Sequence, residues 1–226
     1  MKKKITLVVF AILAICTLNV SAQDSPWHTG VDLYNTYVWR GTKFGTGPSF
    51  QPTVNYSKSG FTIGAWGAYS FSNSVFTVSE GTVVDAYIET DLYASYLLSL
   101  GEKNSLNFTV TDYFFPTSTS SYFDGTQHYF EPMVTLGVGK FSLAGAYMTN
   151  VNDVYVEAGL AVGAVNLFAA AGDGQYTKDT KFNFCNLGIK TVKTIKVSDS
   201  FSIPVTGALI LNPSTEKFHI VVGISL

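Results

Sequence analysis

Seven charged side chains at alternating positions are the residues of this sequence best suited to act on a solute. They share one parity of the alternating runs that fill the chain: Asp32, Arg40, Asp85, Glu89, Asp91, Glu131 and Glu157. Successive side chains of a β-strand point to opposite faces, so all seven are expected on one face. Around a pore they would select what enters. Alternatively, Arg40 pairs with one or two of the carboxylates and fills a narrow interior.

A serine and a histidine offer a second kind of chemistry. His128 follows the serine-rich segment TSTSSYF, which permits a Ser121/His128 dyad. Nucleophilic catalysis needs the serine, the histidine base and an orienting group within hydrogen-bonding reach. No nucleophile motif surrounds Ser121, and serine-rich loops are usually just solvated. We therefore predict no catalytic residue and no enzyme, with a lipid-acting barrel enzyme as the alternative.

Histidine and cysteine usage favours neither a metal site nor a cofactor. The three histidines, His28, His128 and His219, are scattered, and Cys185 is the one cysteine that follows the amino-terminal apolar segment. Zinc sites in proteins combine three or four such ligands at short spacings. We expect no metal ion, no cofactor and no intrachain disulfide.

Alternating runs of apolar and polar residues predict the elements that position these side chains. The stretch from Val31 to Phe71 holds three such runs, separated by a Gly-rich loop and a tight SKSG turn. In its last run Phe61, Ile63 and Tyr69 share one face, and polar or small residues share the other. Strict alternation indicates strands with two different environments. Similar runs continue to Leu226, about twelve in all, although ten strands also fit.

Composition indicates that these strands form a barrel in a membrane. Charged residues make up 13% of the chain, about half the usual share of a soluble domain, and aromatic residues make up 15%. Beyond the amino-terminal segment, no run approaches the roughly 20 apolar residues of a spanning helix. A closed antiparallel up-and-down β-barrel is the remaining way to cross a bilayer.

The connections between the runs alternate in length, which predicts an orientation. Long connections fall near residues 41–49, 72–83, 116–127 and 173–180, and short ones near 58–60, 101–104, 138–140 and 163–164. Outer-membrane barrels have long outer loops and short periplasmic turns. An even strand number then places both termini in the periplasm. Two segments fit less well: NVND is short for an outer loop, and 190–199 is long for an inner turn.

The first 22 residues read as a secretory signal. A lysine cluster, an apolar run and the small residues Val20-Ser21-Ala22 follow one another, in the order that signal peptidase requires. We therefore expect a signal peptide over 1–22 and a barrel domain over 23–226.

Aromatic residues near the predicted strand ends suggest contacts with the membrane interface. They are Tyr37, Trp39, Tyr69, Phe71, Tyr96 and Phe114. Aromatic girdles are typical of such barrels, and a sugar or lipid platform is the alternative. Trp66 has the opposite parity, so it is expected to pack in the lumen. The last run, Phe218 to Leu226, is the expected contact with the barrel-insertion machinery, although it ends in leucine where many such barrels end in an aromatic residue.

Several motifs of the first half resemble one bacterial family. YVWRG, GPSFQP and SGFTIGAWG, followed by ETDLYASYLLSL and VTDYFFP, are similar to the Gcw_chp family, a family of bacterial outer-membrane barrels of uncharacterised function. The resemblance covers residues 31–116 well and the last third hardly at all. It implies a fold and a location, and no activity.

These observations predict an outer-membrane β-barrel of a Gram-negative bacterium with a narrow charged lumen. Its expected role is a passive small-solute channel or a structural component of the envelope, in contact with outer-membrane lipid. A soluble secreted β-protein is the further alternative, which the low charge content and the apolar parity of every strand disfavour. The formal net charge of −2 suggests no nucleic-acid partner, and the sequence leaves the oligomeric state open.

Overall fold

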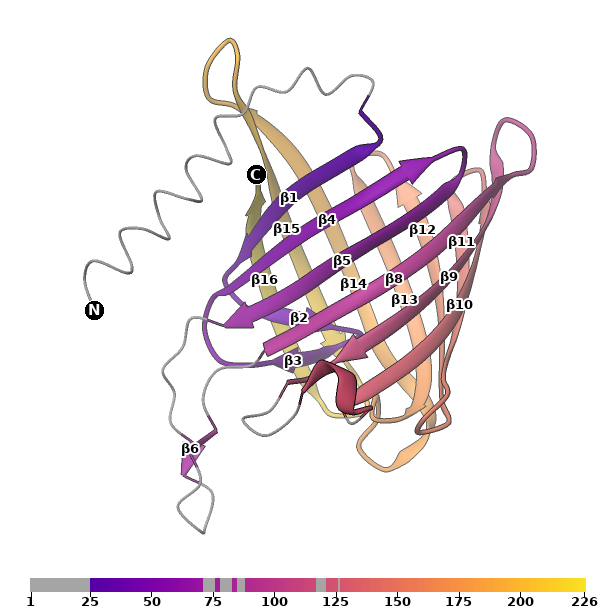
Figure 1. The fold of residues 1–226 in the computed structure, drawn as a ribbon, viewed down its shortest axis with the longest axis vertical. Coiled ribbons are helices and arrows are strands. Elements are labelled where there is room, and N and C mark those ends of the chain that lie inside the picture. The colour runs from indigo at the N-terminus through magenta and orange to yellow at the C-terminus, as the bar shows by residue number, and fades with distance from the viewer. Residues whose placement is uncertain (1–24, 71–75, 78–82, 85–87, 117–120, 126) are drawn as a thin grey trace.

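Antiparallel strands close into a barrel in the computed structural model (Figure 1). The structure describes residues 25–70, 76–77, 83–84, 88–116, 121–125 and 127–226. Among these residues the wall consists of β1 (Trp27–Tyr34), β4 (Ser49–Lys58), β5 (Phe61–Ser70), β8 (Ile88–Ser99), β9 (Asn104–Phe114), β10 (His128–Val138), β11 (Phe141–Met148), β12 (Asp153–Val162), β13 (Val165–Gly174), β14 (Thr180–Lys196), β15 (Ser202–Asn212) and β16 (Lys217–Ser225). Because β1 pairs with both β4 and β16, the ring is closed. The prediction of a twelve-stranded up-and-down barrel is confirmed. The proposed signal peptide, residues 1–22, lies outside the described residues.

The two faces of the wall differ in polarity, as the alternation predicts. Outward side chains are apolar and exposed, for example Ile63 at 52% and Val110 at 52% exposure. Inward side chains include buried carboxylates such as Glu131, which is 1% exposed. The barrel is therefore apolar outside and polar inside. No helix within the described part of the chain is long and apolar enough to cross a membrane.

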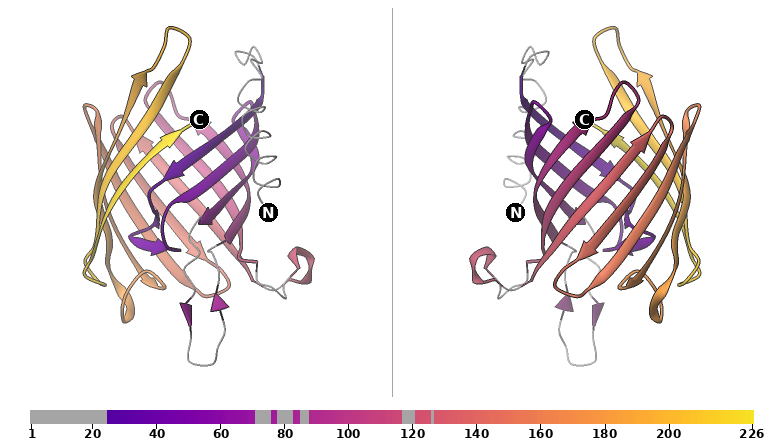
Figure 2. Two further views of the ribbon diagram at one scale, coloured as in Figure 1. Left: turned by 90° about the vertical axis from the view of Figure 1, so that its left-hand side faces the viewer. Right: turned by 90° about the vertical axis from the view of Figure 1, so that its right-hand side faces the viewer.

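The connections gather at two ends of the barrel. At one end, which we call the loop end, lie the connection from β1 to β4, the turn from β11 to β12, and the short β6 (Phe76–Thr77), β7 (Val83–Val84) and η2 (Tyr122–Asp124). The short turns, the start of β1 and the end of β16 lie at the other end, the turn end (Figure 2).

One strand is longer than the sequence predicts. We expected a connection over 190–199, but β14 continues to Lys196 and pairs with β15 from Leu187↔Leu211 to Lys196↔Ser202. The β-branched residues Thr191, Val192 and Ile195 explain this extension, because they favour strands even among lysines. The resulting β14–β15 hairpin projects beyond the other turns (Figure 2).

The first wall strand, in contrast, is shorter than the sequence predicts. The run Val31–Arg40 leaves the wall after Tyr34, where the Asn35 side chain adds two hydrogen bonds with β16 to the one from its backbone amide to the Val222 carbonyl. Its Nδ2 donates to the Ile220 carbonyl at 3.0 Å, and its Oδ1 accepts from the Val222 amide at 2.8 Å. The chain then forms a small hairpin of β2 (Tyr37–Trp39) and β3 (Thr42–Phe44), which we call the plug hairpin.

Candidate functional site

The plug hairpin lies inside the barrel and reaches its far wall. Its turn residues Arg40 and Gly41 have φ values of 49° and 79°, as a two-residue type I′ turn requires. A Cβ atom on Gly41 would lie 2.0 Å from the carbonyl oxygen of Cys185 in β14. Cys185 is the extra residue of a β-bulge, since Phe184 and Asn186 pair with consecutive residues of β13. Turn and bulge therefore touch backbone to backbone.

Arg40 is held at the tip of this hairpin by a buried ion pair. Its Nη1 lies 2.5 Å from Oε2 of Glu131 and its Nη2 lies 2.8 Å from Oε1, so the pairing is bidentate. The two side chains are 9% and 2% exposed. Glu131 belongs to β10, which lies almost opposite β1 in the ring. The ion pair thus fixes the hairpin across the lumen.

Aromatic rings enclose the guanidinium. Its Cζ lies 4.2 Å from the ring centroid of Tyr155 and 4.6 Å from that of Trp39, within the range of cation–π attraction. Nη1 also donates to the Tyr176 hydroxyl at 2.8 Å, and Tyr113 donates its hydroxyl to Glu131 Oε1 at 3.1 Å. Burial raises the pKa of Tyr176 to about 12, although the charge of Arg40 opposes the shift. Tyr176 is therefore neutral at physiological pH.

Apolar side chains pack in the lumen around the guanidinium of Arg40. Ala146, Tyr155, Ala170, Tyr176 and Cys185 form one buried cluster, against which Trp39 and Met133 pack. On the other side of the hairpin, the ring of Tyr37 lies 5.6 Å from that of Trp66. The arrangement matches a structural plug better than an open ring of charges.

Of the other predicted lumen charges, Glu157, Glu89 and Asp91 lie inside the barrel, and they differ in their connection to the Arg40–Glu131 pair. Glu157 is linked to it, because its Oε2 accepts from Tyr155 Oη at 2.5 Å and from Asn186 Nδ2 at 3.1 Å. Glu89 and Asp91 are buried at 2% and 5% exposure. The Oδ1 atom of Asp91 has no hydrogen-bond partner among the described residues.

The last two residues that the sequence predicts as lumen charges are not connected to the Arg40–Glu131 pair by any described contact. Asp32 lies in β1 opposite Ser225 and Gln51, with no ion pair to Arg40 among the described contacts. Asp85 lies outside the described residues.

The predicted aromatic girdle separates into three groups. Tyr69 and Tyr96 lie on the outer face, at 37% and 49% exposure. Tyr37 and Trp39 are inside the barrel, which corrects their assignment to a girdle: the chain leaves the wall at Asn35 before reaching them. Phe114 has outward parity but is 6% exposed, because Tyr122 and His128 cover it. Phe71 lies outside the described residues.

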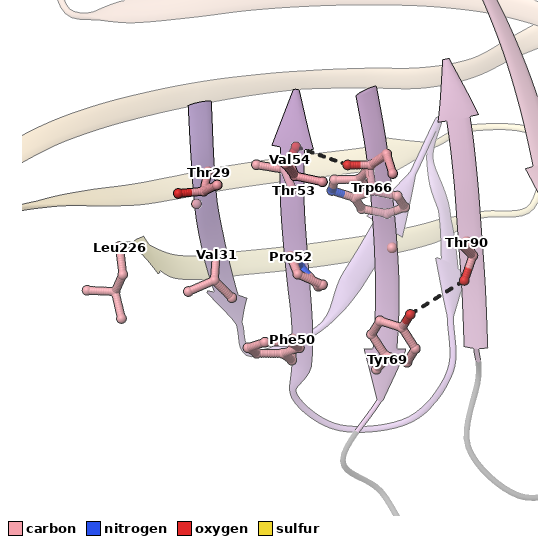
Figure 3. Close-up of a pocket in the computed structure, with 13 residues that line it drawn as sticks. Thr29, Val31, Phe50, Pro52, Thr53, Val54, Trp66, Tyr69, Thr90 and Leu226 are labelled. Atoms are coloured by element: carbon pink, nitrogen blue, oxygen red, sulfur yellow. Dashed lines mark hydrogen bonds between the residues drawn. The ribbon is translucent and has the colours of Figure 1, made fainter. Parts of the chain in front are cut away.

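A shallow apolar groove marks the outer wall over β1, β4 and β5 (Figure 3). Its volume is about 450 Å³, and small residues such as Gly30, Ala65 and Gly67 leave the space. The Tyr69 ring folds over Gly67, and its hydroxyl lies 3.4 Å from Thr90 Oγ1 (Figure 3). Leu226 closes the groove at the β1–β16 seam.

His128 pairs with a carboxylate on the outer face. Its Nδ1 lies 2.8 Å from Oδ1 of Asp112 and its Nε2 lies 2.7 Å from the Tyr122 carbonyl oxygen. Both ring nitrogens of His128 therefore lie at hydrogen-bonding distance from an oxygen atom. Ser121 is exposed at the start of this segment. The Tyr122 hydroxyl donates to Asp112 at 3.0 Å. Burial, and then this bond, raise the pKa of Tyr122, so the phenol stays a donor.

Replacing His128 by alanine is expected to destabilise the barrel by about 1–3 kcal/mol. The substitution removes the imidazole from the largely buried Asp112 carboxylate, which keeps the Tyr122 hydroxyl as a donor, and loss of a hydrogen bond to a buried charged group costs about that much. Unfolding by urea measures the change. His28→Ala is the matched control, because His28 is exposed in β1; an equal loss in both variants would contradict the role of the pair.

Several residues of the plug were missed from the sequence. Tyr155 shares the parity of Glu157 in β12, and Tyr113 has the parity opposite to the outward Phe108 and Val110 in β9, so parity alone identifies both tyrosines as lumen residues. Tyr176 belongs to the polar connection DGQYTKDTK, where no periodicity points inward. Asn186 precedes Leu187 in a bulged strand, where the alternation is broken.

Comparison with known proteins gives one match. The family model Gcw_chp, described as a bacterial protein of unknown function, matches residues 21–194. It thus extends past the motifs quoted above and into β14. No curated protein matches the chain, and no solved structure matches it.

Proposed function

Since the chain belongs to the Gcw_chp family of bacterial proteins of unknown function, we propose a role from its structure: an outer-membrane β-barrel that serves as a closed, structural component of a Gram-negative envelope. Its outer wall contacts lipid, and its lumen is filled by the plug hairpin. Outer loops lie at the loop end, and both termini face the periplasm.

The apolar outer wall is the observation that carries this proposal. Exposed side chains on successive strands are large and apolar, including Phe61, Tyr96, Phe108, Leu143 and Ile220 at 41–57% exposure. Contiguous apolar surface of this extent is rare on monomeric soluble proteins. Lipid is the solvent that such a surface favours, and a closed barrel leaves no unpaired strand edge inside it. A soluble secreted β-protein would require a polar outer surface in contact with water, and the outer surface of this wall is apolar.

The filled lumen favours a closed barrel over a channel. The buried Arg40–Glu131 pair and the aromatic residues around it lie across the lumen, in its half nearer the loop end. A passive channel would instead need a continuous water-filled path lined by such charges. We therefore expect the intact protein to be silent in a planar bilayer.

A depth-dependent substitution tests the membrane location. Val110→Arg, at the middle of β9, is expected to cost about 2–4 kcal/mol of folding free energy in phospholipid vesicles, whereas Val138→Arg, at the turn end of β10, is expected to cost about 0–1 kcal/mol. Both valines are exposed on the outer face, at 52% and 46%. The measurement is unfolding by denaturant after refolding into vesicles.

A soluble protein would give a different result. Arginine at either exposed site would then cost little, and the wild-type chain would refold without lipid or detergent. Equal stability of the two variants, or the absence of heat-modifiable migration on gels, would contradict the proposal.

A further inference from the structure

Two ionisable side chains lie on the outer face of the wall, among apolar neighbours. Asp112 in β9 has the parity of the outward Val110, and His128 in β10 has that of the outward Phe130. Ionisable groups are disfavoured on the lipid-facing side of a barrel, and less so toward the interfaces. β9 ends at Phe114 and β10 begins at His128, so the pair lies where the wall reaches the loop-end interface.

The short η2 covers this pair from the outside. The Tyr122 hydroxyl donates to Oδ2 of Asp112 at 3.0 Å, and the Tyr122 carbonyl oxygen lies 2.7 Å from Nε2 of His128. The Tyr122 ring meets the rings of His128 and Phe114 edge-on, with centroids 4.9 and 5.0 Å apart. The side chains of Asp112 and His128 are left only 16% and 8% exposed. One side of η2 is therefore held against the wall.

The next residue, Phe123, projects away from this contact. Its side chain is 93% exposed, the highest value among the large apolar side chains of the described part of the chain. Its ring lies edge-on to that of Tyr122 at 5.3 Å, so the held tyrosine also positions it. Figure 2 shows η2 to the side of the barrel, at the level of the strand ends. In water such a ring would gain nothing from the hydrophobic effect.

We propose that η2 anchors the loop end of the barrel in the adjacent lipid leaflet, with Phe123 among the acyl chains just below the headgroups. The inference rests on the proposed membrane location. The exposed Phe130 of β10 continues the apolar surface from the wall toward η2, and aromatic rings are typical at this depth. A second copy of the chain would have to bury roughly 1,000 Å² to form a stable contact, much more than one projecting ring offers.

Brominated lipids test the depth of this ring, because bromine quenches only an indole close to it. The full chain carrying Phe123→Trp is refolded into phosphatidylcholine vesicles with and without bromine on the acyl chains. The emission of the wild type, which has three tryptophans, is subtracted. We expect bromine to remove most of the added emission. Phe201→Trp is the matched control, because Phe201 is exposed in the projecting β14–β15 hairpin; aqueous iodide, and not bromine, should quench it.

A third variant separates this inference from the membrane location. Phe130→Trp introduces the same indole on the wall itself, where bromine should quench it. Quenching of Phe130→Trp but not of Phe123→Trp would show a wall in lipid without an anchor, and would overturn the inference. Quenching of neither would overturn the membrane location and the inference with it. Protection of Phe123→Trp from both bromine and iodide, with cross-linking into dimers, would assign the ring to a second copy instead.

The hold of Tyr122 on the wall is tested in the Phe123→Trp chain. Tyr122→Phe removes the hydroxyl that donates to Asp112 and should reduce the quenching by bromine, because the segment is then less firmly positioned. Tyr147→Phe is the control, since it removes a hydroxyl that donates to Asn152 at the same end of the barrel, and it should leave the quenching unchanged. Equal quenching in both variants would show that this bond does not place Phe123.

Discussion

Replacing Arg40 by alanine is expected to lower the free energy of unfolding by about 3–5 kcal/mol and to make a silent barrel conduct. Removing one partner of a buried ion pair leaves the other charge uncompensated, which accounts for a loss of this size. Here the orphaned group is Glu131, 1% exposed and held by both guanidinium nitrogens. The substitution also removes the side chain on which the Tyr155 and Trp39 rings pack. Denaturant unfolding and single-channel recording measure the two effects.

Conservative variants separate the charge of Arg40 from its shape. Arg40→Lys keeps the charge but loses the fork that pairs with both carboxylate oxygens, so its stability should lie between those of the wild type and Arg40→Ala. The double variant Arg40→Met/Glu131→Gln removes both charges and should recover part of the loss. Steady conductance of the wild type, unchanged in Arg40→Ala, would show that the hairpin does not close the lumen.

Substituting Gly41 by alanine is expected to displace the plug hairpin without altering any charge. The new Cβ would lie 2.0 Å from the Cys185 carbonyl oxygen and 3.1 Å from its carbon. Because both contacts are backbone atoms of a wall strand, neither can move as a side chain would. The positive φ of 79° adds strain for any residue with a Cβ. We expect a loss of several kcal/mol, as for other severe disruptions of packing, together with conductance like that of Arg40→Ala.

A second glycine provides the control for backbone strain. Gly139 in the β10–β11 turn also has a positive φ, 61°, but a Cβ there would meet no atom within 4 Å. Gly139→Ala should therefore cost only the strain of the left-handed conformation, about 1 kcal/mol, and should stay silent in the bilayer. Equal losses in the two variants would mean that the contact with Cys185 contributes nothing.

The sequence predicts the barrel well because its signal is repeated in every strand. Period-two alternation places Glu89, Glu131 and Glu157 inside and Ile63 and Val110 outside, and each strand supports the same assignment. The same regularity explains the error at the plug hairpin. Tyr37 and Trp39 continue the alternation of β1, so they resemble wall residues, and only the hydrogen bonds of the Asn35 side chain to β16 reveal the departure.

The partners of Arg40 were harder to predict than its burial. A single arginine among many inward carboxylates must pair with one of them, but parity does not say which. The choice of Glu131 depends on how far the hairpin reaches across the ring and on the bulge at Cys185, neither of which leaves a periodic signal. Tyr176 was beyond prediction for the same reason, since it enters the lumen from a connection.

The pairing of β1 is strongly asymmetric, and this sets where the barrel closes. β1 pairs with β4 through eight residues, from Trp27↔Tyr56 to Tyr34↔Ser49, but its ladder with β16 has three, from Asp32↔Ser225 to Tyr34↔Gly223, extended by backbone bonds between Val31 and Leu226 and from Asn35 to Val222. Every other seam joins neighbours in sequence, whereas this one joins the two ends of the chain and carries the largest loop-closure entropy. We therefore expect the β1–β16 seam to be the last to form during folding, and its amides to exchange with solvent before those of the other wall strands in a hydrogen-exchange measurement.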